Sequence, residues 1–287
     1  MKSIRDFLEL IKFEHTVFAL PFAYLGMLLA ARGWPTWSQF FWITVAMAAA
    51  RTLAMGTNRL ADRWIDARNP RTADRPLVKG SISLRTAGIG TISAGGILAV
   101  AAWQLGSLPF VLLPGAYLLL VGYSFTKRFT WLSHFIVGFT DGLAPMGAWA
   151  AIRNSLFTMD DLPAWILLAV VTFWIGGFDL IYACQDFAFD RQEGLQSVPA
   201  RFGISAALRL SSISHAATVI LLVILGLVTG LVWPYWIGLI VVIGLLTWEH
   251  LLVHPNDLSR INIAFFNINS YISLILFLGI LGSLYLT

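Results

Sequence analysis

Two clusters of acidic residues are the parts of this chain whose residue types and spacing point to chemistry. The first reads NRLADRWID and places Asn58, Asp62 and Asp66 four residues apart. Each step of four residues on an α-helix turns about 40° beyond a full turn, so the three side chains lie on one narrow stripe. Like charges on one stripe repel one another unless a cation lies among them, and oxygen ligands without His or Cys favour Mg²⁺.

The second cluster reads DLIYACQDFAFD and contains Asp179, Tyr182, Asp186 and Asp190. On a single helix these four side chains fall within about 80° of one another. Acidic residues in or near an apolar segment are costly and mark a site that faces a cavity. For either stripe alone, a solvated helix end is the competing interpretation, and the presence of two stripes weakens it.

Basic residues accompany both clusters. NPRTADRPLVKG follows the first cluster, and GYSFTKR contains Tyr123 and Lys127. Mg²⁺ completes its coordination with water and substrate phosphates, so carboxylates beside Arg and Lys indicate a metal-bridged diphosphate. We expect the bases next to the motifs to act on substrate, namely Arg71, Arg75 and Lys127. We expect three others to serve membrane topology alone, namely Arg68, Arg85 and Arg128.

The elements that carry these clusters are predicted to be transmembrane helices. Charged residues make up 12% of the 287 residues, hydrophobic residues 58%, and the mean hydropathy is +0.77. These values exclude a soluble or disordered chain and indicate a polytopic, all-α membrane bundle. The single cysteine, Cys184, excludes a disulfide framework. We expect one domain over residues 1–287 and no nucleic-acid partner.

Nine apolar windows are long enough to cross a bilayer. Nearly all of the 19 Lys and Arg residues fall between alternate windows, which predicts a cytoplasmic N-terminus and places both acidic clusters on the cytoplasmic side. The windows are His15 to Ala31, Ser38 to Thr57, Thr86 to Leu105, Leu108 to Tyr123, Leu132 to Ile152, Ala164 to Ala183, Ile213 to Leu231, Tyr235 to Val253 and Ile263 to Leu286.

Other polar residues within these windows leave alternatives open. Asp141 lies near the centre of the fifth window, where it is either a contact to an acceptor or metal or a structural acid. Asn262, Asn267 and Asn269 near the start of the last window either line the same site or join helices by hydrogen bonds.

Together these motifs resemble the UbiA superfamily of intramembrane prenyltransferases. Both acidic motifs occur in order after the second and sixth predicted spans, the first continues as NPRTADRPL, and the second runs on to ARFG. The resemblance covers nearly the whole chain. It implies nine spans around a central cavity and Mg²⁺-dependent transfer of a polyprenyl group from its diphosphate to an acceptor.

The resemblance also implies roles for individual residues. Asn58, Asp62, Asp66, Asp186 and Asp190 would hold Mg²⁺, and the four carboxylates with Lys127 would form the catalytic set. Arg71, Tyr123 and Lys127 would contact the diphosphate, and Arg75 is expected to bind substrate beside them. Arg51 would meet the carboxylate of an aromatic acid, and Asp179 and Tyr182 would line the acceptor pocket.

The acceptor is open between two aromatic acids, 4-hydroxybenzoate and 1,4-dihydroxy-6-naphthoate, which would place the protein in ubiquinone or menaquinone biosynthesis. The stretch YACQDFAFDRQEG is more like the second branch. We expect a bacterial or archaeal cell-membrane protein with its active site on the cytoplasmic side. The alternatives are a transporter of cations or organic anions and a CDP-alcohol phosphotransferase, whose single acidic segment the chain lacks.

Overall fold

The computed structural model describes the backbone of residues 2–261 and 268–286, and the side chains of these except 2–4 and 13–19. Within these ranges the regular structure is helical, as the composition predicts. The helices in chain order are α1 (Lys2–Leu10), α2 (Phe13–Ala31), α3 (Trp37–Ala61), α4 (Arg63–Arg68), α5 (Leu84–Leu105), α6 (Ser107–Thr126), α7 (Ser133–Arg153), α8 (Leu162–Ala183), α9 (Phe187–Gln192), α10 (Val198–Phe202), α11 (Ile204–Thr229), α12 (Trp233–Leu252) and α13 (Asn269–Leu284), with 3-10 turns at Met159–Asp161 and Cys184–Asp186.

Seven helical segments of the described chain are long and apolar enough to cross a membrane. They are Trp37–Ala61, Leu84–Leu105, Ser107–Thr126, Ser133–Arg153, Met159–Gln192, Ile204–Thr229 and Trp233–Leu252. Two shorter apolar helices, Leu20–Ala31 and Asn269–Leu284, coincide with the first and ninth predicted windows. The ninth window begins at Ile263, and this residue, Asn262 and Asn267 lie outside the described residues. The count of nine spans and the cytoplasmic N-terminus therefore stay predictions.

Glycines set two of the turns between neighbouring long helices. Gly106 separates α5 from α6 with φ +129°, and Gly230 ends α11 with φ +68°. Side chains other than glycine rarely adopt such φ values, so these positions allow the chain to reverse within a few residues. The third and fourth predicted windows, and the seventh and eighth, are therefore joined by tight turns.

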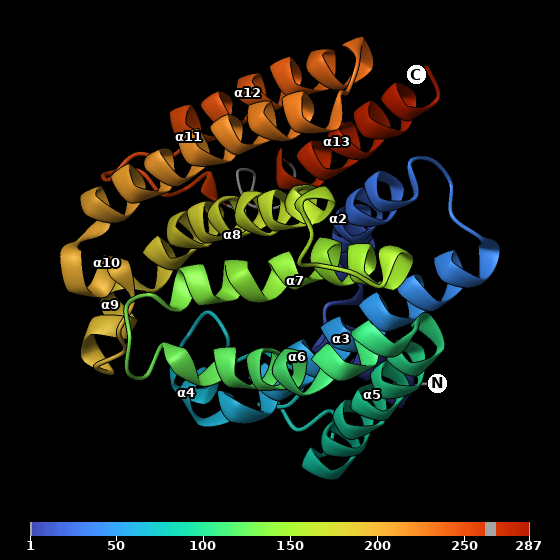
Figure 1. Ribbon diagram of the computed structural model, residues 1–287. Helices are drawn as coiled ribbons and strands as arrows, with labels where there is room; N and C mark the ends of the chain where they lie inside the picture. The colour runs from blue at the N-terminus through green and yellow to red at the C-terminus, as the bar shows by residue number, and fades with distance from the viewer. Residues whose placement is uncertain (1, 262–267, 287) are drawn as a thin grey trace.

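Helix α8 lies inside the bundle, packed between α7 and α11 (Figure 1). Its middle is the most buried of the candidate spans, whereas α6 is the least buried. Large apolar side chains on the outer helices are exposed, including Ile92, Leu118 and Ile240. In a bilayer such side chains contact lipid, so the exposed apolar surface agrees with an integral membrane protein.

The short helices α4, α9 and α10 gather at one end of the bundle (Figure 1). Each follows a long helix or its immediate extension: α4 follows α3, and α9 follows α8 through the turn at Cys184–Asp186. Both acidic motifs lie at these junctions, so the fold brings together two segments more than 100 residues apart in sequence.

Candidate active site

The first acidic motif is divided between two helices. Helix α3 ends at Ala61, Asp62 adopts φ −94° and ψ 5°, and α4 begins at Arg63. The prediction of one continuous helix is therefore wrong at this point. The four-residue spacing is nevertheless kept, because the amide of Asp62 donates to the carbonyl of Asn58 at 2.9 Å and that of Asp66 to Asp62 at 2.8 Å. The stripe therefore survives the interruption between α3 and α4.

The second motif breaks in the same way. Helix α8 ends at Ala183, a 3-10 turn covers Cys184–Asp186, and α9 begins at Phe187. Asp186 adopts φ −95° and ψ 8°, nearly the values at Asp62. The predicted single stripe is corrected here too, since Asp179 belongs to α8, whereas Asp190 belongs to α9.

The two motifs face a common polar cavity of about 220 Å³. Its lining contains every acidic residue predicted for the site and most of the predicted bases. These predicted residues are Asn58, Asp62, Asp66, Arg71, Arg75, Tyr123, Lys127, Asp179, Tyr182, Asp186 and Asp190. Arg51 alone of the predicted site residues lies elsewhere, in the adjoining cavity.

Each of the four motif carboxylates pairs with a different base. The closest nitrogen-to-oxygen distances are 2.9 Å for Arg128 and Asp62, 2.6 Å for Arg75 and Asp66, 2.5 Å for Arg71 and Asp186, and 2.9 Å for Lys127 and Asp190. Arg128 therefore does more than serve topology, and that expectation is wrong. The sequence signal that could have identified Arg128 as a site residue is its position directly after Lys127, which was predicted to act on substrate.

The segment after the first motif reaches across to the second. Asn69 donates from Nδ2 to Asp186 at 2.9 Å, and Arg71 donates from Nε to the same oxygen at 2.9 Å. Arg71 also donates from Nη1 to the hydroxyl of Tyr182 at 2.8 Å. Asn69 was not predicted as a site residue, although it begins the NPRT sequence that carried Arg71.

Charge and burial oppose each other at this end of the bundle. Burial raises the pKa of Asp62 above its ordinary value, while the hydrogen bond from Arg128 acts in the other direction. Burial alone would lower the pKa of Arg71, but the hydrogen bonds and negative charge of Asp186 outweigh it and raise this pKa.

The donor set suits a hard divalent cation. The candidate ligands are the oxygens of four carboxylates and of the Asn58 amide. His134 also lines the cavity, but its two ring nitrogens lie within hydrogen-bond distance of Asp179 and the amide of Val198. Asp190 is fully buried, and neither carboxylate oxygen accepts a hydrogen bond, although Lys127 lies 2.9 Å away. Among the described residues no group of three or more His, Cys, Asp or Glu side chains is drawn together at metal-binding distances. The four carboxylates instead turn towards their bases.

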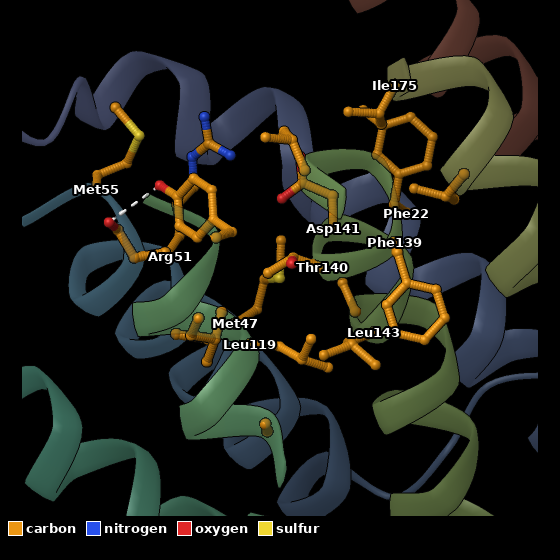
Figure 2. Close-up of a pocket in the computed structure, with 18 of the residues that line it drawn as sticks. Phe22, Met47, Arg51, Met55, Leu119, Phe139, Thr140, Asp141, Leu143 and Ile175 are labelled. Atoms are coloured by element: carbon orange, nitrogen blue, oxygen red, sulfur yellow. Dashed lines mark hydrogen bonds between the residues drawn. The ribbon is translucent and has the colours of Figure 1, made fainter. Parts of the chain in front are cut away.

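A much larger cavity of about 1210 Å³ adjoins the polar one. Arg71, Tyr123, Asp179 and Tyr182 line both, so the two cavities share a boundary. The walls are mostly apolar and come from several helices, with Phe22, Phe139 and Leu143 among the side chains in Figure 2. The hydroxyl of Tyr123, at the boundary, donates to the carbonyl of Ala54 at 3.1 Å.

Arg51 and Asp141 are among the charged side chains that line this cavity. Arg51 comes from α3 and Asp141 from α7 (Figure 2). The Nε of Arg51 is buried without a hydrogen-bond partner, and the described part of the chain contains no ion pair to Arg51. Asp141 lines the cavity, which leaves both of its predicted roles open.

Asn269 combines the two roles weighed for the asparagines of the last window. It lines the large cavity, and it joins helices by accepting from Trp174 Nε1 at 2.8 Å and donating to Glu249 at 3.4 Å. The geometry therefore supports both interpretations at this residue.

Comparison with known proteins agrees with this arrangement. Residues 19–271 match the profile of the UbiA prenyltransferase family. A 4-hydroxybenzoate octaprenyltransferase of Chromohalobacter salexigens is 32% identical over 292 residues, which cover 99% of this chain and 95% of the relative. The apo structure of a UbiA homolog from Aeropyrum pernix has a TM-score of 0.85 at 32% identity and covers 94% of this chain and 98% of its own. A UbiA homolog from Archaeoglobus fulgidus bound to DMAPP and Mg²⁺ shares the fold, with a TM-score of 0.64, 21% identity, and coverage of 94% and 99%.

Proposed function

The chain belongs to the UbiA prenyltransferase family, and from this premise we propose that it transfers a polyprenyl group from polyprenyl diphosphate to the ring of a small aromatic acid. It is a transferase of an integral membrane family, which decides against the transporter and the CDP-alcohol phosphotransferase. The observation that carries the proposal is the junction of two cavities, one polar and lined by paired carboxylates and bases, the other large and apolar.

The polar cavity suits a metal-bound diphosphate. Asn58, Asp62, Asp66, Asp186 and Asp190 would hold Mg²⁺ there, which fits the oxygen-only donor set and the unsatisfied oxygens of Asp190. The metal, when bound, neutralises the diphosphate as it leaves. Divalent metal in a related fold, with Mg²⁺ in the Archaeoglobus fulgidus structure, supports this assignment.

The bases that now pair with carboxylates are suited to bind the diphosphate. Arg71, Arg75 and Lys127 each place a cationic nitrogen at the edge of the polar cavity. Phosphate oxygens can replace carboxylate oxygens as their partners, because both accept charge-assisted hydrogen bonds. These residues would then stabilise the charge that develops on the leaving group. Tyr123 would join them at the boundary with the apolar cavity.

The apolar cavity suits the prenyl chain and the acceptor. Its walls exclude water, which would otherwise capture the allylic cation before the acceptor ring carbon does. Arg51 would pair with the acceptor carboxylate, since its Nε is unsatisfied and it belongs to the same helix as Asn58. Asp179 and Tyr182 lie where this cavity meets the polar one and would contact the acceptor there.

The acceptor is proposed to be 4-hydroxybenzoate, because the curated relatives with which the chain shares up to 32% identity carry that substrate in their names. The second candidate is 1,4-dihydroxy-6-naphthoate, favoured by the sequence between Tyr182 and Gly194. Both acids would meet Arg51 through a carboxylate. The positive-inside bias supports an active site on the cytoplasmic side of the cell membrane.

The test is diphosphate release by the purified protein in detergent with Mg²⁺, a polyprenyl diphosphate and a panel of acceptors. The panel is 4-hydroxybenzoate, 1,4-dihydroxy-6-naphthoate and 1,4-dihydroxy-2-naphthoate. We expect release with an aromatic acid and loss of release in Asp62→Ala and Asp186→Ala. Asp160→Ala is the matched control, because Asp160 is exposed and lines neither cavity. Absence of release with every acceptor would contradict the proposal.

The same assay tests Arg51. Arg51→Ala should raise the KM for the acceptor and leave the KM for prenyl diphosphate unchanged. The opposite result, a raised KM for prenyl diphosphate alone, would show that Arg51 binds the other substrate.

A further inference from the structure

His134 lies in the first turn of α7, on the face that packs against α8. His134, Gly138 and Gly142 are four residues apart and share this face. A side chain at Gly138 would overlap the carbonyl of Thr172, and one at Gly142 would contact that of Leu168 at 2.8 Å. The two glycines therefore let α7 and α8 approach closely, as small residues do between membrane helices. This approach brings His134 next to Asp179 on α8.

The hydrogen bonds of His134 determine where its proton lies. The backbone N–H of Val198 points at Nε2, 3.2 Å away, and Nδ1 lies 2.7 Å from Oδ2 of Asp179. A backbone N–H can only donate, so Nε2 must be the unprotonated, accepting nitrogen. The ring is therefore neutral, with its proton on Nδ1, and Nδ1 donates to Asp179.

Asp179 stands at the boundary of the two cavities, whereas His134 is nearly buried and lines the polar cavity alone. The side chain of Asp179 is 29% exposed and lines both cavities, and that of His134 is only 3% exposed. His134 thus holds one oxygen of a carboxylate that remains accessible from the cavities. A buried donor with a fixed proton restricts the rotation of the acceptor that it bonds.

His134 also ties Asp179 to the segment that follows the second acidic motif. Val198 begins α10, and the loop before it is bound at two further points. The amide of Gln196 donates to the carbonyl of Lys127 at 2.7 Å, and that of Leu195 to the carbonyl of Asp190 at 2.8 Å. The side chain of His134 therefore connects Asp179, at the boundary of the two cavities, with the loop that follows the second acidic motif.

We infer that His134 is a positioning residue for the aromatic acceptor: it fixes the orientation of Asp179 so that this carboxylate accepts a hydrogen bond from the hydroxyl of the acceptor. The inference rests on the proposed function and adds to it a residue that contacts neither substrate. It assigns to Asp179 the hydroxyl end of the acceptor, as Arg51 takes the carboxylate end.

Three substitutions of His134 distinguish a role in orienting Asp179 from a role in packing alone. Asparagine can place an amide N–H near the position of Nδ1, glutamine places its amide nearer that of Nε2, and alanine removes both. We expect His134→Ala and His134→Gln to raise the KM for the acceptor on the order of tenfold, the effect of losing a hydrogen bond to a charged group. The KM for prenyl diphosphate should change less than about twofold by the same reasoning, and His134→Asn should recover most of the acceptor affinity. His254→Asn is the control, because His254 is exposed and lines neither cavity.

A purely structural role would raise both KM values together, or would leave His134→Asn as impaired as His134→Ala, and either result overturns the inference. Failure of the proposed function looks different, since the unmodified protein would then release no diphosphate with any acceptor.

A second measurement needs no activity. The ¹⁵N spectrum of histidine-labelled protein should contain one neutral ring with a protonated Nδ1 and an unprotonated Nε2. That signal should disappear in His134→Asn and persist in His254→Asn. A protonated Nε2 at His134 would overturn the inference even in a fully active enzyme.

Discussion

The two acidic motifs are alike in backbone and unlike in the charges that surround them. The helix α3 ends just before Asp62, and α8 is followed by a 3-10 turn that ends at Asp186. Both aspartates have φ close to −95° and ψ close to 5–8°, and a six-residue helix follows that carries the next aspartate. Asp62 and Asp66 thus correspond to Asp186 and Asp190. The resemblance fits a pseudo-repeat in which the local geometry of the carboxylates is the part retained.

The difference lies in which motif supplies the opposing charge. In the segment after the first motif, Arg75 forms an ion pair with Asp66 of the same motif. Asn69 and Arg71 of this segment donate hydrogen bonds to Asp186 of the second motif. The segment after the second motif contributes one exposed ion pair in return, from Glu193 to Arg68 at 2.8 Å, and no ion pair of Arg191 or Arg201 occurs in the described ranges. The first motif therefore organises both halves of the site.

Burial differs between one pair of corresponding aspartates. Asp186 is 7% exposed beside the central helix α8, whereas Asp62 is half-buried at the end of the outer helix α3; Asp66 and Asp190 are both buried, at 6% and 0% exposed. A buried carboxylate depends more strongly on its partners than an accessible one. A change at Asp186 should therefore cost more than the equivalent change at Asp62.

The largest expected effect is at Asp186. Asp186→Asn removes the negative charge to which Arg71 and Asn69 both donate hydrogen bonds, and kcat/KM for prenyl transfer should fall on the order of 10³-fold. Asp62→Asn should cost about tenfold less, because its partner Arg128 is itself exposed and can turn to water. Steady-state diphosphate release measures both. Equal losses would mean that the two motifs contribute alike, whatever their burial.

The next effect compares two arginines of the first motif. Arg71 donates hydrogen bonds to Asp186 from two nitrogens, Nε and Nη2. Arg75 donates to both oxygens of Asp66 from Nη1 alone, at 2.6 Å. A lysine can replace a single donor nitrogen but not a planar fork. Arg71→Lys should therefore lower kcat/KM by about 10²-fold and Arg75→Lys by less than about tenfold. The reverse order would show that the fork at Arg71 is incidental to substrate binding.

The sequence predicted the contents of this site better than its connections. Spacing along one helix identified both carboxylate stripes, and the apolar windows located the helices that carry them, because period and hydropathy are local properties. The breaks at Asp62 and Asp186 were missed, since a run of residues at helical spacing looks the same whether or not the helix is interrupted within it.

Contacts between distant segments account for the other omissions. Asn69, Arg128 and His134 find their partners on other helices, and no spacing rule connects Asn69 with Asp186, 117 residues away. Arg128 was assigned to topology because a base at a cytoplasmic helix end satisfies the positive-inside rule equally well with or without a carboxylate beside it. Only packing decides between these roles.

Asn69 offers a smaller test of the crossing between motifs. It donates to Asp186 and also accepts from the backbone N–H of Arg71 at 3.0 Å, which shapes the turn that presents Arg71. Asn69→Ala should raise the KM for prenyl diphosphate about tenfold through the loss of these bonds. Asn69→Asp keeps the acceptor for Arg71 but sets a like charge against Asp186, so it should be worse than alanine. If Asn69→Asp raised the KM for prenyl diphosphate less than Asn69→Ala, the hydrogen bond to Asp186 would contribute less to substrate binding than the turn that presents Arg71.

The smallest effect is expected where the motifs meet at the surface. Arg68, the last residue of α4, pairs with Glu193, just after α9, at 2.8 Å, and the two side chains are 59% and 23% exposed. Exposed pairs contribute about 0–1 kcal/mol, so Arg68→Ala should change kcat/KM less than about twofold. The charge-reversed double variant Arg68→Glu with Glu193→Arg should behave like the unmodified enzyme, and Arg191→Ala serves as a control for losing a nearby positive charge. If Arg68→Ala lowered kcat/KM more than tenfold and the double variant restored it, the motifs would be coupled through this pair as well as through Asn69 and Arg71. The asymmetry between the motifs would then be confined to the buried part of the site.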